Sequence, residues 1–256
     1  MKTTLLPLPA LLIISMAAGC ASPSESERII AAAAKTQRSD LLKNSLVSFH
    51  FRDASFTMKR NGGRFEYTRT FSDSLGNEVF DVVNNDGITR SVAGRPVSLD
   101  STKHRSVYVD VNSVVYFASL PLPLLDPGVR SRYLGESQID NQMLHKVEVT
   151  FTPEDGGLDH DDRFIYWFSK DDHTIRYMSY FFHTDGGGSR FRKAINIRRV
   201  NGIQFADYLN YASEPDTVRL SVDRFDHYYE SGMVSRVSDV ISDNIAVSFA
   251  PSDISF

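Results

Sequence analysis

The densest group of residues that could bind a metal is Asp159-His160-Asp161-Asp162, which follows two glycines. Carboxylate oxygens are the ligands that a hard cation such as Ca²⁺ prefers, but the segment lacks the alternating acidic positions and the terminal glutamate of an EF-hand loop. The seven histidines are dispersed, without the helical His pair of zinc enzymes. A solvated connection between strands explains the segment more simply. We therefore expect no metal or cofactor, with Asp159, His160, Asp161 and Asp162 as the candidates if one binds.

Arg190 and Arg192 form a second candidate site, because residues two apart on a strand point to the same face. Phe191 would point to the other face. The glycines of Asp185-Gly186-Gly187-Gly188 precede them, but the G-K-[ST] sequence and following helix of a phosphate loop are missing. The two arginines are thus candidates for binding a carboxylate or a lipid headgroup at the rim of a cavity, or for pairing with acidic neighbours.

Sequence signatures of nucleophilic hydrolases are absent. The chain has neither a G-x-S-x-G elbow nor an S-x-x-K set. His160 with Asp161 could act as an acid–base pair only if the fold brought a serine beside them. We expect a non-enzymatic protein, with a hydrolase or metal-dependent enzyme built on Asp159–Asp162 as an alternative.

Aromatic residues on two neighbouring predicted strands indicate an apolar binding site. Tyr166, Trp167 and Phe168 are followed across a hairpin by Tyr177 and by Tyr180, Phe181 and Phe182. A sheet with rings on both faces must be covered on both or present one face to a ligand. The proline-locked leucines that follow Phe117 could cover the concave face. The predicted ligand-binding residues are Phe117, Leu122, Leu124, Trp167, Tyr180, Phe182, Arg190 and Arg192.

The elements that must position these residues are mostly strands. Ser26 to Asn44 predicts a helix capped by Ser26, and Val47, Phe49 and Phe51 then begin an alternation of period two. Asp110 to Ala118 predicts a short helix before the proline-rich segment 120–127, which must be irregular. Val218–Tyr229 is ambiguous between helix and strand. Further strands are predicted over 142–151, 163–169, 174–182, 189–200, 203–211 and, as one or two, 235–249. The fold class is mainly β (α+β), a single large curved antiparallel sheet with an N-terminal helix and a short helical lid.

The charge balance excludes one class of partner. The formal net charge is −4 and the arginines are scattered, which argues against nucleic-acid binding. No second apolar segment after the N-terminal one is long enough to cross a membrane.

Cys20 is the chain's single cysteine, and it follows a basic Lys2, an apolar run and Ala17-Ala18-Gly19. This order resembles a bacterial lipobox, in which the thiol is acylated after cleavage. We expect residues 1–19 to be a lipoprotein signal peptide, 20–27 the lipidated cysteine and tether, and 28–256 one half-barrel-like domain without disulfides. Ala21 after the cysteine implies, by resemblance to Gram-negative sorting, an exported protein anchored to the outer membrane.

Three further segments resemble a family of uncharacterised lipoproteins from Bacteroidetes-type bacteria. They are 111–117 with Leu120-Pro121, 156–162 ahead of Tyr166-Trp167, and 187–194 ahead of Asn210-Tyr211. The arrangement of elements is also similar to the LolA/LolB half-barrel, a likeness of fold that does not transfer function. We expect a binding or carrier module for an apolar or amphipathic, lipid-like ligand, or alternatively a structural lipoprotein that binds an envelope protein.

Overall fold

The structure is a computed structural model that describes residues 22–152, 162–182, 187–214 and 220–249. In these residues the strands form two seven-stranded antiparallel sheets. The first sheet has the order β14 (Ser242–Phe249), β1 (Asn44–Phe51), β2 (Ala54–Asn61), β3 (Arg64–Ser72), β4 (Glu78–Asn84), β5 (Gly87–Val92) and β6 (Arg95–Val97). The second has the order β13 (Ser235–Val240), β12 (Ile203–Ala212), β11 (Gly188–Val200), β10 (Ile175–Phe182), β9 (Phe164–Ser169), β8 (Gln142–Phe151) and β7 (Val129–Ile139).

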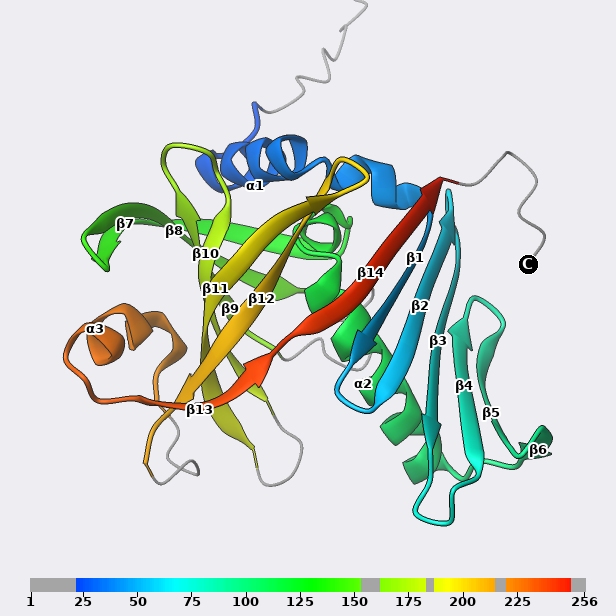
Figure 1. Cartoon of the computed structure of the whole chain (residues 1–256). Coiled ribbons are helices and arrows are strands. Elements are labelled where there is room, and N and C mark those ends of the chain that lie inside the picture. The colour runs from blue at the N-terminus through cyan, green and yellow to red at the C-terminus, as the bar shows by residue number, and fades with distance from the viewer. Residues whose placement is uncertain (1–21, 153–161, 183–186, 215–219, 250–256) are drawn as a thin grey trace, which may run out of the picture.

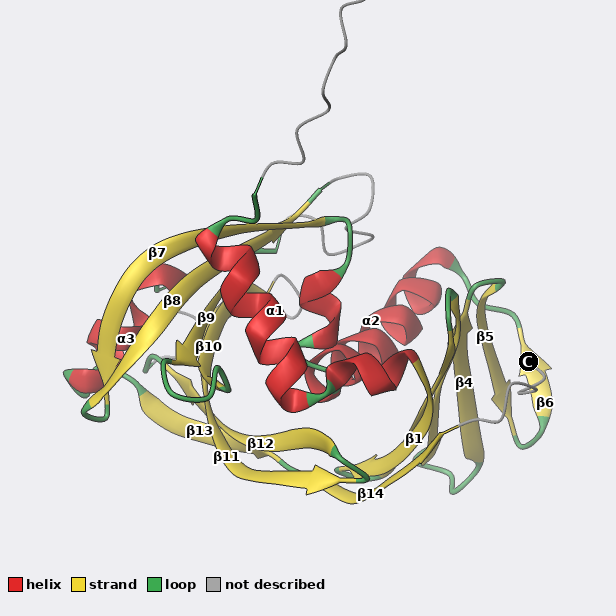
Figure 2. Cartoon of the chain, turned by 90° about the horizontal axis from the view of Figure 1, so that it is seen from above, coloured by secondary structure: helices red, strands yellow, loops and turns green. Residues whose placement is uncertain are grey.

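The two sheets join where the chain passes from one to the other. β13 pairs with β12, and after Ile241 alone β14 pairs with β1. The buried carboxylate of Asp207 accepts hydrogen bonds there from Arg198 and, at 3.0 Å, from the backbone N–H of Ser242. Figure 2 shows the sheets following one curve around the helices. The predicted mainly β, curved antiparallel architecture is confirmed, but its strands form two sheets where a single large sheet was predicted.

Helix α1 (Glu25–Gln37) lies inside the curve (Figure 2). Its N-cap is Ser24, not the predicted Ser26, because Ser24 and Glu27 form a capping box. Ile29, Ile30 and Ala33 form the stripe that packs on the second sheet. Arg38 ends the helix in a left-handed conformation, and the 3₁₀ turn η1 (Ser39–Lys43) leads into β1.

Helix α2 (Ser101–Ala118) also lies inside the curve and is longer than the predicted Asp110–Ala118 segment. Val107, Val111 and Val115, four residues apart, are buried against the first sheet. The proline-rich segment then forms the 3₁₀ turn η2 (Leu122–Leu125) after a cis Leu120–Pro121 bond. The turn buries Leu122 and Leu124, which had been predicted to line or cover a ligand cavity.

The convex face of the second sheet is covered by η5 (Val222–Arg224) and α3 (Phe225–Glu230), which lie outside the curve in Figure 1. The ambiguous segment 218–229 is thus helical from Val222 onward. β9 is buried at all six positions because α1 and η2 cover one of its faces and η5 and α3 the other.

Candidate functional site

The candidate site lies between the last turns of α2 and the concave face of the second sheet. Because the valines of α2 face the first sheet, Tyr116 and Phe117 on the next flank of the helix turn toward β9 and β10. The Phe117 ring lies 5.2 Å from the ring of Tyr180, and the Tyr116 ring lies 5.6 Å from that of Phe164. These distances are typical of aromatic pairs, which hold the helix end against the sheet.

A buried pair of phenols fixes this contact further. The hydroxyls of Tyr116 and Tyr166 are 2.8 Å apart. Burial raises the pKa of Tyr166 well above its ordinary value, and burial also raises the pKa of Tyr208 to about 12, with the positive charge of Arg192 opposing that rise. The phenols on this wall of the site therefore stay neutral at physiological pH, and they bring no negative charge to it.

A cleft of about 710 Å³ opens beside these rings. This volume lies within the range of ordinary small-molecule sites, roughly 300–1,000 Å³. Five of the eight predicted ligand-binding residues line it: Phe117, Tyr180, Phe182, Arg190 and Arg192. A smaller cavity of about 320 Å³ shares Phe117 and Arg192 with the cleft, so these two side chains stand between the two spaces.

Arg192 is the charged group most deeply placed in the site. The residue is only 9% exposed, and its guanidinium carbon lies 3.9 Å from the ring centroid of Phe117 and 5.1 Å from that of Tyr180. Its Nε donates to Oδ1 of Asn210 over 3.3 Å, whereas its Nη1 is buried without any hydrogen-bond partner. Among the described residues, Arg192 forms no ion pair with a carboxylate. It is a buried cation held mainly by two rings.

Polar side chains continue from Arg192 across neighbouring strands. Arg192 on β11 is opposite Asn210 on β12, and Asn210 is opposite Ser238 on β13. The Nδ2 of Asn210 donates to the hydroxyl of Ser238 over 3.2 Å, and all three residues line the cleft. The sequence analysis missed Asn210 and Ser238. The sequence does contain one sign of Asn210: it is a polar residue two positions after Tyr208 on the same face of β12, where an apolar residue would be expected.

The cleft is electropositive although the whole chain is acidic. Among the described residues its lining includes five arginines, Arg52, Arg60, Arg105, Arg190 and Arg192, and two aspartates, Asp126 and Asp162. Burial raises the pKa of Asp126, with Arg60 opposing the rise. The chain's formal net charge is −4, so this excess of positive charge is local to the cleft.

Arg190 and Arg192 on β11 point to the cleft face, and Phe191 between them points to the α3 face, as the strand alternation predicted. The Arg190 guanidinium lies 4.7 Å from the ring centroid of Phe182. Leu122 and Leu124 are buried in the core and are not among the residues lining the cleft. They hold η2 in place, so the structure does not bring them to the cavity.

Trp167 is a correction to the predicted site. It is fully buried on the other face of the second sheet, where its ring packs 5.6 Å from that of Phe191 and its Nε1 donates to the hydroxyl of Ser137 over 2.8 Å. Alternation along β9 places Phe164 and Tyr166 on the concave face, so Trp167 between them must face α3. It cannot share a cavity with Phe117.

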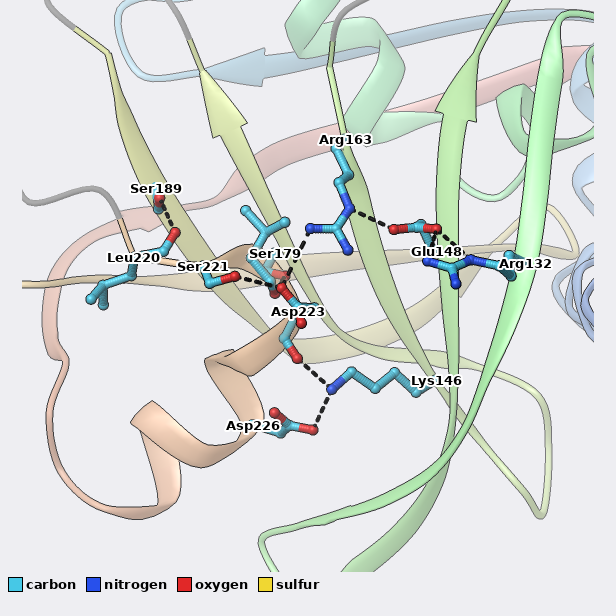
Figure 3. Close-up of polar contacts among 11 residues, drawn as sticks. Arg132, Lys146, Glu148, Arg163, Ser179, Ser189, Leu220, Ser221, Asp223 and Asp226 are labelled. Carbon is cyan, nitrogen blue, oxygen red and sulfur yellow. Dashed lines mark hydrogen bonds and ion pairs between the residues drawn. The ribbon is translucent and has the colours of Figure 1, made fainter.

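Polar contacts attach η5 and α3 to the second sheet, as Figure 3 shows. Lys146 donates to the carbonyl of Asp223 and to the carboxylate of Asp226. Arg163 donates to Glu148 over 2.5 Å and also contacts the carboxylate of Asp223. Ser179 and Ser189 donate to backbone carbonyls of the same segment. These contacts close the convex face over β8, β9 and β10.

The remaining predicted features fall partly outside the described residues. Asp159, His160 and Asp161 lie outside them, and Asp162 lines the cleft. Within the described ranges, no group of three or more His, Cys, Asp or Glu side chains is placed to hold a metal ion. Cys20 and residues 1–19 also lie outside the described part. Among the described helices, none is long and apolar enough to cross a membrane.

Residues 33–242 match the model of DUF6503, a family of unknown function, and the chain belongs to that family. The predicted membership of an uncharacterised family is thereby confirmed. No curated protein matches the sequence.

Among solved structures, the fold is similar to a DUF1329 family protein from Desulfovibrio piger (13% identity, TM-score 0.44, covering 82% of this chain and 100% of that one). It is also similar to a LolA superfamily protein from Nitrosomonas europaea (9%, TM-score 0.45, 86% and 94%). A third is a putative outer membrane lipoprotein-sorting protein domain from Vibrio parahaemolyticus (9%, TM-score 0.31, 71% and 84%). The function is argued below from the residues of this chain.

Proposed function

We propose that this protein is a non-enzymatic binding or carrier module for an apolar or amphipathic small molecule, which binds in the concave cleft. The observation that carries the proposal is the lining of the cleft: rings from α2, β8, β9 and β10 pack on one another and also line an open space of about 710 Å³. Elsewhere in the described residues, aromatic side chains such as Trp167 and Phe191 pack without such a space. Apolar lining with a few convergent polar groups is the usual composition of a small-molecule site.

The proposal includes the location of the protein. Residues 1–19 serve as a lipoprotein signal peptide, Cys20 carries the lipid, and the domain is exported and anchored to the outer membrane. Only Ala21, Ser22 and Pro23 lie between Cys20 and Ser24, the cap of α1. The helix therefore starts within the predicted tether 20–27, and the anchored domain would stand close to the membrane that supplies an apolar ligand.

The test is to isolate the protein from its own envelope and to identify what is bound by native mass spectrometry and lipid extraction. We expect one defined apolar or amphipathic molecule per protein. Ser113→Trp is the blocking variant, because Ser113 lies on α2 and lines both the cleft and the smaller cavity. It should lose the bound molecule.

His104→Trp is the matched control, because His104 is exposed on the same helix and is not among the lining residues. It should retain the molecule. A protein without any bound small molecule, isolated with one stoichiometric envelope protein, would refute the carrier proposal and favour a partner-binding lipoprotein. Equal retention of the molecule by both variants would place the binding site elsewhere.

A further inference from the structure

We propose that the ligand is an anionic amphiphile, whose carboxylate or phosphate head binds Arg192 while its apolar chain lies along the rings of the cleft. The inference rests on the proposed function and adds the chemical class of the ligand and the direction in which it lies.

Arg192 differs from the buried acidic side chains of this fold, which have arginine partners. Buried Asp81 is paired with Arg69 and Arg90, and buried Asp207 is paired with Arg198. Glu148 likewise has both Arg132 and Arg163 as partners. Taking a charge out of water costs several kcal/mol unless a partner compensates it. Arg192 is as buried as Glu148, but no carboxylate among the described residues compensates its charge.

The geometry around Arg192 also favours an anion. Phe117 covers a face of the guanidinium, and Nε is used by Asn210, which leaves the buried Nη1 as a donor without an acceptor. A guanidinium binds carboxylate and phosphate oxygens through such N–H groups. Ser238 accepts from Asn210 and has no described acceptor for its own proton, so it offers a second donor on the same wall. These donors match an anion, whereas a cationic head at this place would be repelled by the charge of Arg192.

A continuous row of aromatic rings begins at Arg192 in the cleft. From Arg192, the ring of Phe117 is followed by that of Phe164 at 6.4 Å, and the ring of Phe164 by that of Phe151 at 5.9 Å. Val129 also lines the cleft at β7. An apolar chain that starts at Arg192 can therefore run over contiguous apolar surface, while the excess of arginines favours a negative head.

The experiment compares four soluble amphiphiles with the same chain and different heads: decanoate, decyl phosphate, decanol and decyltrimethylammonium. The protein isolated from its envelope is placed in phosphatidylcholine nanodiscs, and binding is measured by calorimetry against empty nanodiscs. We expect decanoate or decyl phosphate to bind about 10- to 100-fold more tightly than decanol, because a charge-assisted hydrogen bond is worth about that factor. The decyltrimethylammonium ion should bind most weakly. Acetate and inorganic phosphate, tested alone, separate a free-anion site from an amphiphile site.

The test variant is Arg192→Met, which keeps an apolar side chain of similar length against Phe117. It should reduce the affinity for the anionic amphiphiles to that for decanol and leave decanol binding unchanged. Arg95→Gln, an exposed arginine on β6 outside the cleft, is the matched control and should change neither.

The outcomes separate the two proposals. Equal binding of all four heads, or anionic binding that Arg192→Met does not weaken, would overturn the anionic ligand and leave the carrier function standing. Binding of acetate or phosphate as tight as that of the amphiphiles would overturn the apolar chain. Binding of none of the probes would overturn the carrier function as well. If Arg192→Met does not fold, Ser238→Ala replaces it and should weaken anionic binding alone.

Discussion

The guanidinium carbon of Arg192 lies 3.9 Å from the ring centroid of Phe117, a contact that joins strand β11 to the end of helix α2. A desolvated cation–ring contact is worth about 2 kcal/mol, which is less than the several kcal/mol needed to dehydrate an ion. The contact therefore positions Arg192 without fully compensating its burial. The burial of Arg192 thus costs more free energy than its contact with Phe117 returns.

Arg192→Met is expected to leave the thermal stability of the ligand-free protein unchanged or to raise it. The substitution removes a buried charge without breaking an ion pair, and the methionine can still pack on Phe117. A gain of 1 kcal/mol would raise Tm by about 2–4 °C in a domain of this size. Calorimetry on delipidated protein checks this. A Tm several degrees below that of the Arg95→Gln control would show that Arg192 has a structural role.

Phe117→Ala is expected to connect the cleft with the smaller cavity, because Phe117 lines both. Phe117 is half-buried, so the free energy of unfolding should fall by less than the ~3–5 kcal/mol lost with a fully buried phenylalanine. The variant should bind longer-chain ligands better than the wild-type protein does. Urea unfolding and calorimetry with a chain-length series measure both effects. An unchanged chain-length preference would mean that Phe117 does not limit the site.

Gly188→Ala is expected to weaken ligand binding through Phe182. A Cβ at position 188 would lie 2.9 Å from Cζ of the Phe182 ring, so the ring must move, and Phe182 lines the cleft. Gly63→Ala is the matched control, since a Cβ there meets no atom within 4 Å. Affinity should fall in the first variant only, with a small change in Tm in either. Equal affinities would show that Phe182 makes no contact with the ligand.

Acid is expected to loosen the cover of η5 and α3 before it changes the concave cleft. Burial raises the pKa of Glu148, but hydrogen bonds from Arg163 and Arg132 outweigh this and lower it overall. The pKa of Asp223 is lowered by Ser221. A carboxyl group whose pKa is lower in the folded protein than in the unfolded chain stabilises the fold at a pH above its unfolded-state pKa. This stabilisation is lost as the pH falls through the lower, folded-state pKa.

Trp167, the chain's single tryptophan, lies beneath this cover and reports its state by fluorescence. Its emission should stay constant as pH falls to about 4.3, the ordinary pKa of a glutamate, and should shift to longer wavelength below that. In Glu148→Gln the pH dependence should be weaker, because one of the titrating groups is gone. A shift centred near pH 6.5, the ordinary pKa of a histidine, would show that these carboxylates do not control the cover.

The strands could be predicted because residues that become buried and residues that stay exposed alternate along them and differ in type. Val47 and Phe49 are buried and Leu46 and Ser48 are not, which identifies β1 from its residue types. The first half of α2 could not be found in this way, since residues 101–106 are exposed and offer no apolar stripe. The division of the strands into two sheets could not be predicted from the sequence either. Residues 235–240 and 242–249 both resemble strands, and only their distant partners, β12 and β1, decide which ladder each joins.

The candidate site was predicted in part for the same reason. Alternation correctly separated Arg190 and Arg192 from Phe191, but it does not say which face of a strand is concave. Trp167 was placed with the cleft because nothing in its own segment shows that α3 covers it. Ser238 became part of the site only through the pairing of β12 with β13.

The joint at Ile241 has a consequence for aggregation. Of the four sheet edges among the described residues, those of β13 and β14 adjoin each other there, and β6 and β7 are the two edges far from this joint. Pro96 removes a backbone donor from β6, and α1 lies against β7, with Ser26 and Ser131 in hydrogen-bond contact. Proline and a covering helix are two known means of preventing strand addition. The open curved sheet is thus protected from edge-to-edge polymerisation without being closed into a barrel, and its interior stays open to a ligand.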